Sequence, residues 1–146
     1  MAQDSFSAQV DAWVEDKIEL QDAIFKESVQ RTIEAMQVPV SSGGNMPVDT
    51  GFLRASLQAA LGDPGFSVVF KPTDGSSFTY NAGEVALVIA SAHLGETITA
   101  VYTANYAFFV EYGTSKMGAR RFVGLAAQQW PRIVSEVAAE ARSGAG

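Results

Sequence analysis

The apolar positions of the chain form two long helical patterns, one toward each end. In residues 7–36, apolar side chains recur at spacings of three, four or seven positions, as in an amphipathic helix. They are Val10, Val14, Ile18, Phe25, Val29, Ile33 and Met36, and Trp13 widens the stripe. A second helix is predicted over Arg120 to Ala141, with Phe122, Ala126, Trp130, Ile133, Val137 and Ala141 on its apolar face. Pro131 lies inside it and removes one backbone hydrogen bond, so we expect this helix to be kinked or split.

The first helix is predicted to be longer than the body of the protein. Thirty helical residues rise about 45 Å, whereas a compact domain of this size is about 40 Å across. Asp4 or Ser5 is suited to cap the start, and Pro39 with the Gly43-Gly44 pair ends the pattern. We therefore expect the helix to extend beyond its own domain and to contact a neighbouring molecule.

The segment after the first helix predicts a loop, a short helix and a strand. A flexible loop is expected over Ser41 to Pro47. Asp49 is placed to cap a helix over Gly51 to Leu61, because Leu53, Leu57 and Leu61 lie in helical register. Turns are expected at 62–65 and 72–75, with a strand over Phe66 to Phe70 between them.

Three further elements are predicted before the second long helix. Residues 84–93 fit a buried strand or a helix, and Leu94-Gly95 favours the helix because it resembles a helix stop. Residues 97–103 are β-branched and alternating, which predicts a strand with Ile98, Ala100 and Tyr102 on one face. A short helix is expected over Tyr106 to Tyr112, ended by Gly113.

Composition indicates one folded domain over residues 1–146, with a mobile end at 143–146. Apolar residues make up 47% of the chain and charged residues 18%, which is unlike a disordered segment. There is no cysteine, so disulfides and thiolate metal sites are excluded. We expect no signal peptide and no membrane span, because the longest apolar run, 85–92, is far shorter than the roughly 20 residues that a bilayer requires.

The net charge of −6 is distributed unevenly along the chain. Residues 1–37 hold eight acids and three bases, a net of −5, and residues 38–114 hold six acids and two bases, a net of −4. Residues 115–146 hold two acids and five bases, a net of +3. An acidic chain is poorly suited to grip nucleic acid. The C-terminal bases form either a basic patch or, as we favour, ordinary solvated and salt-bridged side chains.

No motif in the chain sets up enzyme chemistry. Asp49-Thr50-Gly51 matches the triplet of aspartic proteases, and a homodimer would place two such carboxylates around one proton. However, Pro47 is unsuited to the central strand that should precede the triplet, and the bulky Phe52 follows where a small residue is needed. His93 is the only histidine and has no metal-ligand or triad context. We therefore predict no enzymatic activity, cofactor or metal.

An aromatic segment near position 110 contains a single acid. At helical spacing Phe108 and Tyr112 share a face, whereas Glu111 points elsewhere. A carboxylate among such bulky neighbours requires a partner. Arg54 is the candidate, because it is one of only two bases between positions 38 and 114. The alternative is that Arg54 and Glu111 are both solvated.

Two motifs together resemble the tail-component or neck family of long-tailed lambdoid-like bacteriophages, whose members act in tail completion and head–tail joining. The first motif is Pro47-Val48-Asp49-Thr50-Gly51-x-Leu53-Arg54-x-Ser56. The second is Tyr106-Ala107-x-x-Val110-Glu111-Tyr112-Gly113-Thr114, followed by Phe122 at the start of a helix. The resemblance covers about positions 10 to 140 and is absent from 65–93, so the topology there is left open.

The resemblance implies an α+β fold, with a small, mostly antiparallel sheet flanked by long N- and C-terminal helices. It implies a structural virion protein of a phage, or of a phage-derived particle such as a gene transfer agent, assembled in the host bacterial cytoplasm. The protein would form a homo-oligomeric ring, six-fold like other tail-end components, next to connector, tail-terminator or tail-tube proteins. DNA would pass through its lumen without specific binding. A non-enzymatic binding module with a cytoplasmic protein partner is the alternative.

Overall fold

The computed structural model describes residues 5–145. Its elements in chain order are α1 (Phe6–Gln37), a 3-10 turn η1 (Val40–Ser42), α2 (Phe52–Ala55), β1 (Leu57–Leu61), α3 (Ala82–Ser91), β2 (Ile98–Tyr102), α4 (Ala107–Tyr112), α5 (Phe122–Gln128) and α6 (Trp130–Ala145). The fold is therefore α+β, with a small antiparallel sheet and long helices at both ends of the chain, as expected.

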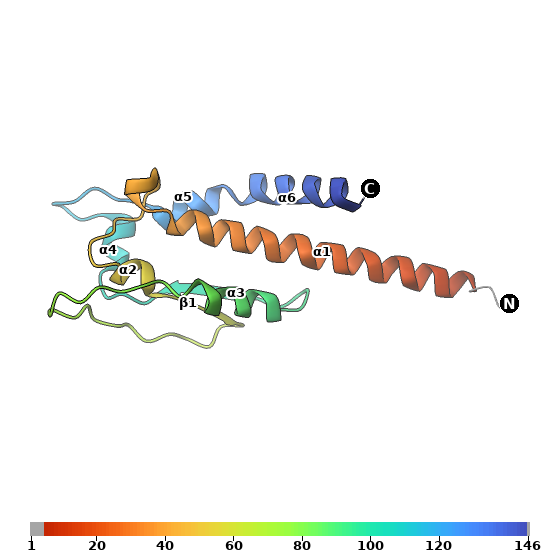
Figure 1. Ribbon diagram of the computed structural model, residues 1–146, viewed down its shortest axis with the longest axis horizontal. Coiled ribbons are helices and arrows are strands. Elements are labelled where there is room, and N and C mark those ends of the chain that lie inside the picture. The colour runs from red at the N-terminus through yellow and green to blue at the C-terminus, as the bar shows by residue number, and fades with distance from the viewer. Residues whose placement is uncertain (1–4, 146) are drawn as a thin grey trace.

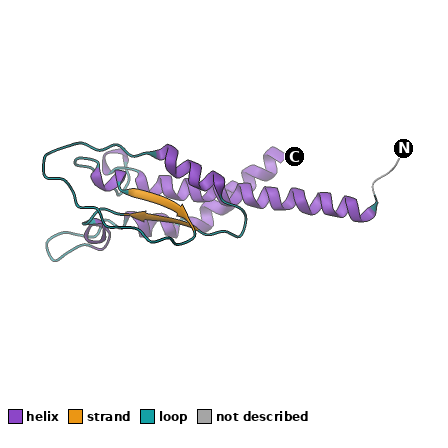
Figure 2. Cartoon of the chain, turned by 90° about the horizontal axis from the view of Figure 1, so that it is seen from below, coloured by secondary structure: helices purple, strands orange, loops and turns teal. Residues whose placement is uncertain are grey.

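Helix α1 is the axis around which the other elements are arranged. Its start is capped by Ser5, whose hydroxyl oxygen accepts a hydrogen bond from the Ala8 amide at 3.2 Å. Asp4, the other predicted cap, lies outside the described residues. Helices α5 and α6 run back along one side of α1, while the sheet and α3 lie on its other side (Figure 1). The N-terminal part of α1 continues beyond all of them, as expected from its predicted length (Figure 2).

The predicted helix over Gly51 to Leu61 is wrong. Only Phe52–Ala55 is helical, and Leu57–Leu61 forms strand β1, which pairs antiparallel with β2. The leucine spacing of four fits both structures, because every second residue of a strand lies on the same face. Leu57 lies opposite Tyr102 and Leu61 opposite Ile98, so the apolar face of each strand matches that of the other.

The segment between the two strands contains one correct and one wrong prediction. The helix expected at 84–93 is present as α3, whose first turn is capped by the Asn81 side chain. The strand expected at Phe66 to Phe70 is absent. Only Val69 makes a single parallel bridge, to Ala104, and the remainder of this stretch is loop. The bridge partner Ala104 lies two residues past the end of β2 at Tyr102, so Val69 meets this segment where the sheet has already ended.

The second long helix is split, as Pro131 predicts. Helix α5 ends at Gln128, Gln129 is its cap, and α6 begins at Trp130. Pro131 thus lies in the first turn of α6, where a missing amide costs little. Helix α6 continues to Ala145, past the predicted end at Ala141, and Gly146 lies outside the described residues.

The buried side chains form two clusters that meet at Tyr102. One cluster fills the space between the C-terminal half of α1, the sheet, α3 and α5; its buried members are Ile33, Met36, Leu57, Val85, Ile89 and Ala126. The other joins α2, α4 and the start of α5 through Met46, Phe52, Leu53, Ala104, Val110 and Phe122. The Tyr102 ring contacts both clusters and meets Phe122 edge to face, with 4.9 Å between ring centroids.

Candidate interaction surfaces

The two motifs that carry the family resemblance pack against each other. Phe52 and Leu53 from the first motif share a buried cluster with Val110 from the second, and with Phe122. The ring of Tyr106 lies beside that of Phe52, with 6.2 Å between centroids. Burial raises the pKa of Tyr106, against the opposing effect of the nearby Lys71 ammonium. The motifs therefore build one structural unit rather than two separate sites.

Glu111 does not pair with Arg54, which corrects the predicted ion pair. The buried Glu111 carboxylate instead accepts hydrogen bonds from the first amides of α5: Val123 donates to Oε2 and Gly124 to Oε1, each at 2.9 Å. A helix N-terminus has amides without helical partners and a partial positive charge, so it satisfies a buried carboxylate without any cation. This contact fixes α5 to the end of α4.

Arg54 joins α2 to the end of α1. Its Nε donates to the Gln37 carbonyl at 2.9 Å, and the Gln37 side-chain amide donates back to the Arg54 carbonyl at 3.0 Å. The guanidinium also lies over the ring of Tyr80, 5.3 Å from its centroid. The Tyr102 hydroxyl completes this group by donating to Gln37 Oε1 at 2.6 Å. Burial raises the pKa of Tyr102 far above its ordinary value.

Asp49 caps no helix, contrary to the sequence prediction. The residue at the cap position of α2 is Gly51, so no side-chain hydrogen bond caps this helix. The Asp49 side chain is 89% exposed and pairs with the Lys71 ammonium at 3.3 Å. A single exposed carboxylate paired with a lysine is unlike two carboxylates that share a proton.

Within residues 5–145, the buried hydroxyl of Thr50 has no hydrogen-bond partner.

Gly51 and Gly113 lie where other backbone atoms come too close for a side chain. Gly51 has a φ of +85°, and a Cβ there would collide with the Phe78 carbonyl oxygen. Gly113 has a φ of +82° and ends α4, as predicted; a Cβ there would lie 2.7 Å from the Ala119 nitrogen. Thr114 then exchanges backbone hydrogen bonds with Met117 and begins a loop that leads to α5.

An aromatic and basic surface lies at the end of the molecule farthest from the N-terminus (Figure 1). The rings of Phe108 and Tyr112 lie beside each other on α4, tilted by 47° with 4.7 Å between centroids, and Phe109 meets Phe108 edge to face. All three rings are at least half exposed. The following loop carries Lys116 and Arg120, both exposed and without an ion pair among the described residues. We call this surface, Phe108, Phe109, Tyr112, Lys116 and Arg120, the distal surface.

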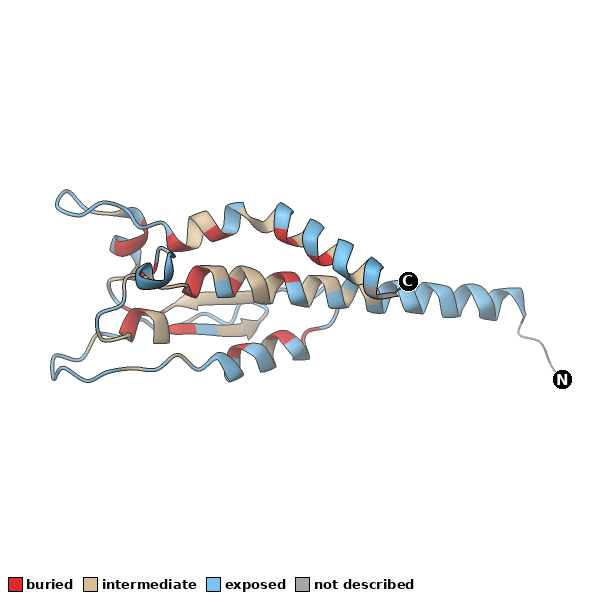
Figure 3. Ribbon diagram, turned by 45° about the horizontal axis from the view of Figure 1, so that its top comes forward, coloured by how far each residue is buried: buried red, intermediate tan, exposed pale blue. Residues whose placement is uncertain are grey.

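The N-terminal half of α1 offers a second exposed surface, at the opposite end (Figure 3). Every residue from Ser5 to Glu19 is exposed. The apolar members share one helical face, and with the acids they form what we call the α1 stripe: Phe6, Val10, Trp13, Val14 and Ile18, flanked by Asp11, Glu15, Asp16 and Glu19. None of these four acids forms an ion pair within residues 5–145.

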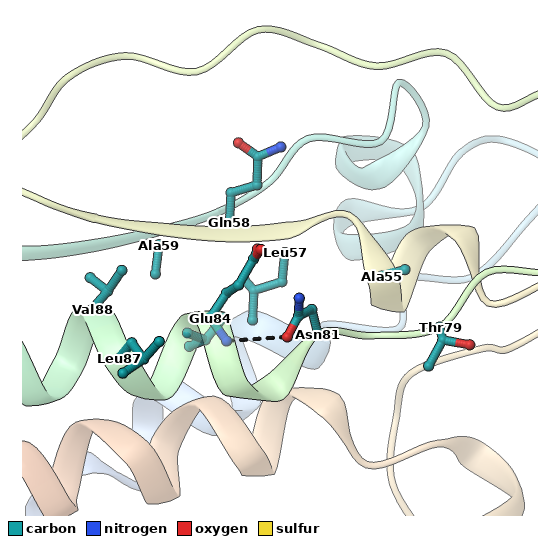
Figure 4. Close-up of a pocket in the computed structure, with 10 residues that line it drawn as sticks. Ala55, Leu57, Gln58, Ala59, Thr79, Asn81, Glu84, Leu87 and Val88 are labelled. Atoms are coloured by element: carbon teal, nitrogen blue, oxygen red, sulfur yellow. Dashed lines mark hydrogen bonds between the residues drawn. The ribbon is translucent and has the colours of Figure 1, made fainter.

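A shallow groove of about 490 Å³ lies between α3 and β1 (Figure 4). Its polar side chains include Gln58, Asn81 and Glu84, and the Asn81 side chain is occupied in capping α3. The remaining lining is largely alanine, leucine and valine. Thr79 supplies the only hydroxyl among these lining residues, and Asn81 lies between it and Glu84 in Figure 4.

His93, possible metal ligands and possible membrane spans were the remaining candidate features. His93 is exposed just after α3, where the sequence placed it. Among the described residues, no group of three or more histidine, cysteine, aspartate or glutamate side chains is arranged to hold a metal ion. No helix within that part of the chain combines the length and apolar character needed to cross a membrane.

Sequence reasoning missed one feature of these surfaces and left another as the less favoured alternative. Phe6, which was missed, belongs to the exposed stripe, and its spacing of four from Val10 was the available signal. The cations of the distal surface belong to the C-terminal bases for which a basic patch was the alternative interpretation. The preferred reading of the C-terminal bases as solvated or salt-bridged suits Arg132, which pairs with Glu136, but Lys116 and Arg120 remain unpaired among the described residues.

No family model, curated protein or solved structure matches this chain.

Proposed function

We propose that this chain is a structural virion protein of a tailed bacteriophage, or of a phage-derived particle such as a gene transfer agent. It forms a ring, six-fold in its expected symmetry, at the head–tail junction or tail end and helps to join or complete the tail. It carries no enzymatic activity. Its partners are further copies of itself and the connector, tail-terminator or tail-tube proteins of the same particle.

The observation that carries this proposal is the packing of the two resemblance motifs into one unit between two exposed surfaces. Glu111 and Gly113 shape the turn from α4 to α5, and Phe52, Val110 and Phe122 bury its base. The motif residues thus hold the distal surface in place. A protein whose signature residues support an exposed aromatic surface, with no enzyme-like site beneath it, suits assembly better than catalysis.

The charge of the chain is compatible with a channel for DNA. The net charge of the chain is −6. An acidic wall repels phosphate, so DNA slides past without specific binding. Assembly of the particle in the host bacterial cytoplasm accords with a sequence free of cysteine.

The direct test is deletion of the gene from the particle that encodes it. We expect electron microscopy to show filled heads and separate tails, and expect the supplied protein to restore joined particles in a complementation assay. Normal particles without the protein would contradict the neck assignment. Leu87→Ser, on the exposed face of α3 and remote from both surfaces, is the matched control and should complement fully.

We expect the purified protein to be a monomer or weak oligomer that closes its ring only on the virion. The net negative charge opposes self-assembly, and a template that aligns the copies raises their effective concentration. Analytical ultracentrifugation at several salt concentrations measures this. A stable closed ring at micromolar protein, insensitive to salt, would contradict templated assembly. A stable complex with one unrelated host protein would instead favour the binding-module alternative.

A further inference from the structure

We infer that the α1 stripe of one copy docks on the distal surface of the next copy, head to tail. This inference rests on the proposed function, because it names the contact by which the proposed ring would close.

The apolar row of α1 is covered by the chain itself along only half of its length. In the C-terminal half, Ile33 and Met36 are buried, and the Phe25 ring meets that of Trp130 from α6 at 6.4 Å between centroids. Toward the N-terminus the same row continues through Ile18 to Phe6, where every side chain is exposed and α1 extends past the end of α6 (Figure 1). The exposed stripe is thus the uncovered continuation of an existing helix interface.

The stripe has the composition of an interface centre. Trp13 is 61% exposed and Phe6 is 81% exposed. Aromatic residues dominate the binding free energy of protein interfaces, and tryptophan is the most enriched of them at hot spots. An isolated surface helix with these side chains in water would leave a large apolar face unburied.

The charges of the two surfaces indicate that the α1 stripe binds the distal surface of another copy rather than another α1 stripe. The α1 stripe is flanked by Asp11, Glu15, Asp16 and Glu19 against a single base, Lys17, so two α1 stripes would repel each other. The distal surface offers aromatic rings with Lys116 and Arg120 beside them, free of ion pairs within residues 5–145. Apolar area thus meets apolar area and acids meet bases, which is the complementarity that sets partner orientation.

The positions of the two surfaces exclude a contact within one molecule. The α1 stripe and the distal surface lie at opposite ends of the long axis (Figure 1). The contact must therefore join two copies, and because its two sides differ it is heterologous. Heterologous contacts repeat from copy to copy and close into a ring when the rotation between copies allows it.

Single cysteines test the contact, because the chain contains none of its own. We would place Val10→Cys in the α1 stripe and Ser115→Cys next to Lys116 of the distal surface. Ser91→Cys on α3 is the control. Pairs of variants, one carrying a size tag, are mixed at high protein concentration and treated with a short bis-maleimide. We expect the Val10→Cys and Ser115→Cys pair to give about tenfold more linked product than either variant with itself or with the control.

Charge reversal then tests the specificity of the contact. Lys116→Glu with Arg120→Glu should reduce the linked product about tenfold. Asp11→Lys with Glu15→Lys on the mixed partner should restore it, which a folding defect would not allow. Predominant self-linking of Val10→Cys would show α1 pairing with α1 and would overturn the inference. Equal products from all pairs, the control included, would show random collision and would overturn it as well.

Complementation separates this inference from the proposed function. Specific linking by a protein that fails to join tails would refute the neck assignment and leave the head-to-tail contact intact. Full complementation by the Lys116→Glu and Arg120→Glu variant, with linking lost, would refute the contact and leave the neck assignment intact.

Discussion

The Glu111 carboxylate, at the end of α4, accepts a hydrogen bond from the amide of Gly124 at 2.9 Å and so caps a helix that begins eleven residues later in the chain, at Phe122. The capping residue of a helix is usually its immediate neighbour in sequence. Here the α4–α5 loop bends back so that Gly124 and its neighbour Val123 both donate to the same side chain. The orientation of α5, and with it the distal surface, depends on this contact.

We predict that Glu111→Ala lowers the free energy of unfolding by about 2 kcal/mol, because two buried amides lose a charged acceptor. Glu111→Gln should cost about 1 kcal/mol, since its amide retains one acceptor oxygen but presents an NH₂ group to the second amide. Urea denaturation measures both. Glu19→Ala, exposed on α1, is the control and should change little. Equal and negligible losses for both Glu111 variants would contradict the capping role.

The partly buried side chain of Tyr102 predicts a loss of stability at alkaline pH. Burial raises the pKa of Tyr102 well above the ordinary tyrosine value of about 10. The unfolded chain therefore releases this proton first, so the stabilisation is present below about pH 10 and is lost as the pH rises further. Tyr102→Phe should cost about 1 to 2 kcal/mol at pH 7 and weaken the decline above pH 10. Exposed Tyr112→Phe is the control. An alkaline decline unchanged by Tyr102→Phe would refute this account.

We predict that Gly51→Ala is more damaging than Gly75→Ala, although both glycines have a φ near +80°. Gly75 has open space around it, so alanine there lowers the free energy of unfolding only through its left-handed backbone, by about 1 kcal/mol. At Gly51 the new methyl group would also meet the Phe78 carbonyl, which should raise the loss to about 3 kcal/mol. Thermal or urea denaturation of the two variants gives the difference directly. Matching losses would show that the contact with Phe78 is not tight.

Asp49 gives a prediction opposite to the one its sequence context suggested. A helix cap would lose about 1 kcal/mol on replacement by alanine and almost nothing on replacement by asparagine. Because Asp49 is exposed and its carboxylate pairs with Lys71 at the surface, we expect Asp49→Asn and Asp49→Ala to behave alike, each within about 0.5 kcal/mol of the parent chain. Chemical denaturation of the two variants measures this. A clear excess loss for alanine would restore the capping interpretation.

The errors of sequence reasoning have a common physical origin in contacts between distant segments. Arg54 and Glu111 were paired because bases are scarce between positions 38 and 114, yet each found backbone partners instead, in Gln37 and in the first turn of α5. Sequence spacing shows which charges exist but not which free amides and carbonyls the fold brings beside them. Lys71, the partner of Asp49, lies in a loop that shows no periodic pattern.

The sequence by itself determined α1, α3, β2, α4 and the broken helix of α5 and α6, because each is specified by a period, a cap or a proline within its own residues. It also determined that α1 would extend beyond the rest of the domain, since the length of a helix follows from its number of residues. Only the tertiary structure decided that Leu57–Leu61 is a strand: its leucine spacing suits either form, and the hydrogen bonds that decide come from Ile98–Tyr102. The same holds for the two exposed surfaces. Their residues are visible in the sequence, but their placement at opposite ends depends on the fold: α4 lies at the C-terminal end of α1, and α5 and α6 run back along α1.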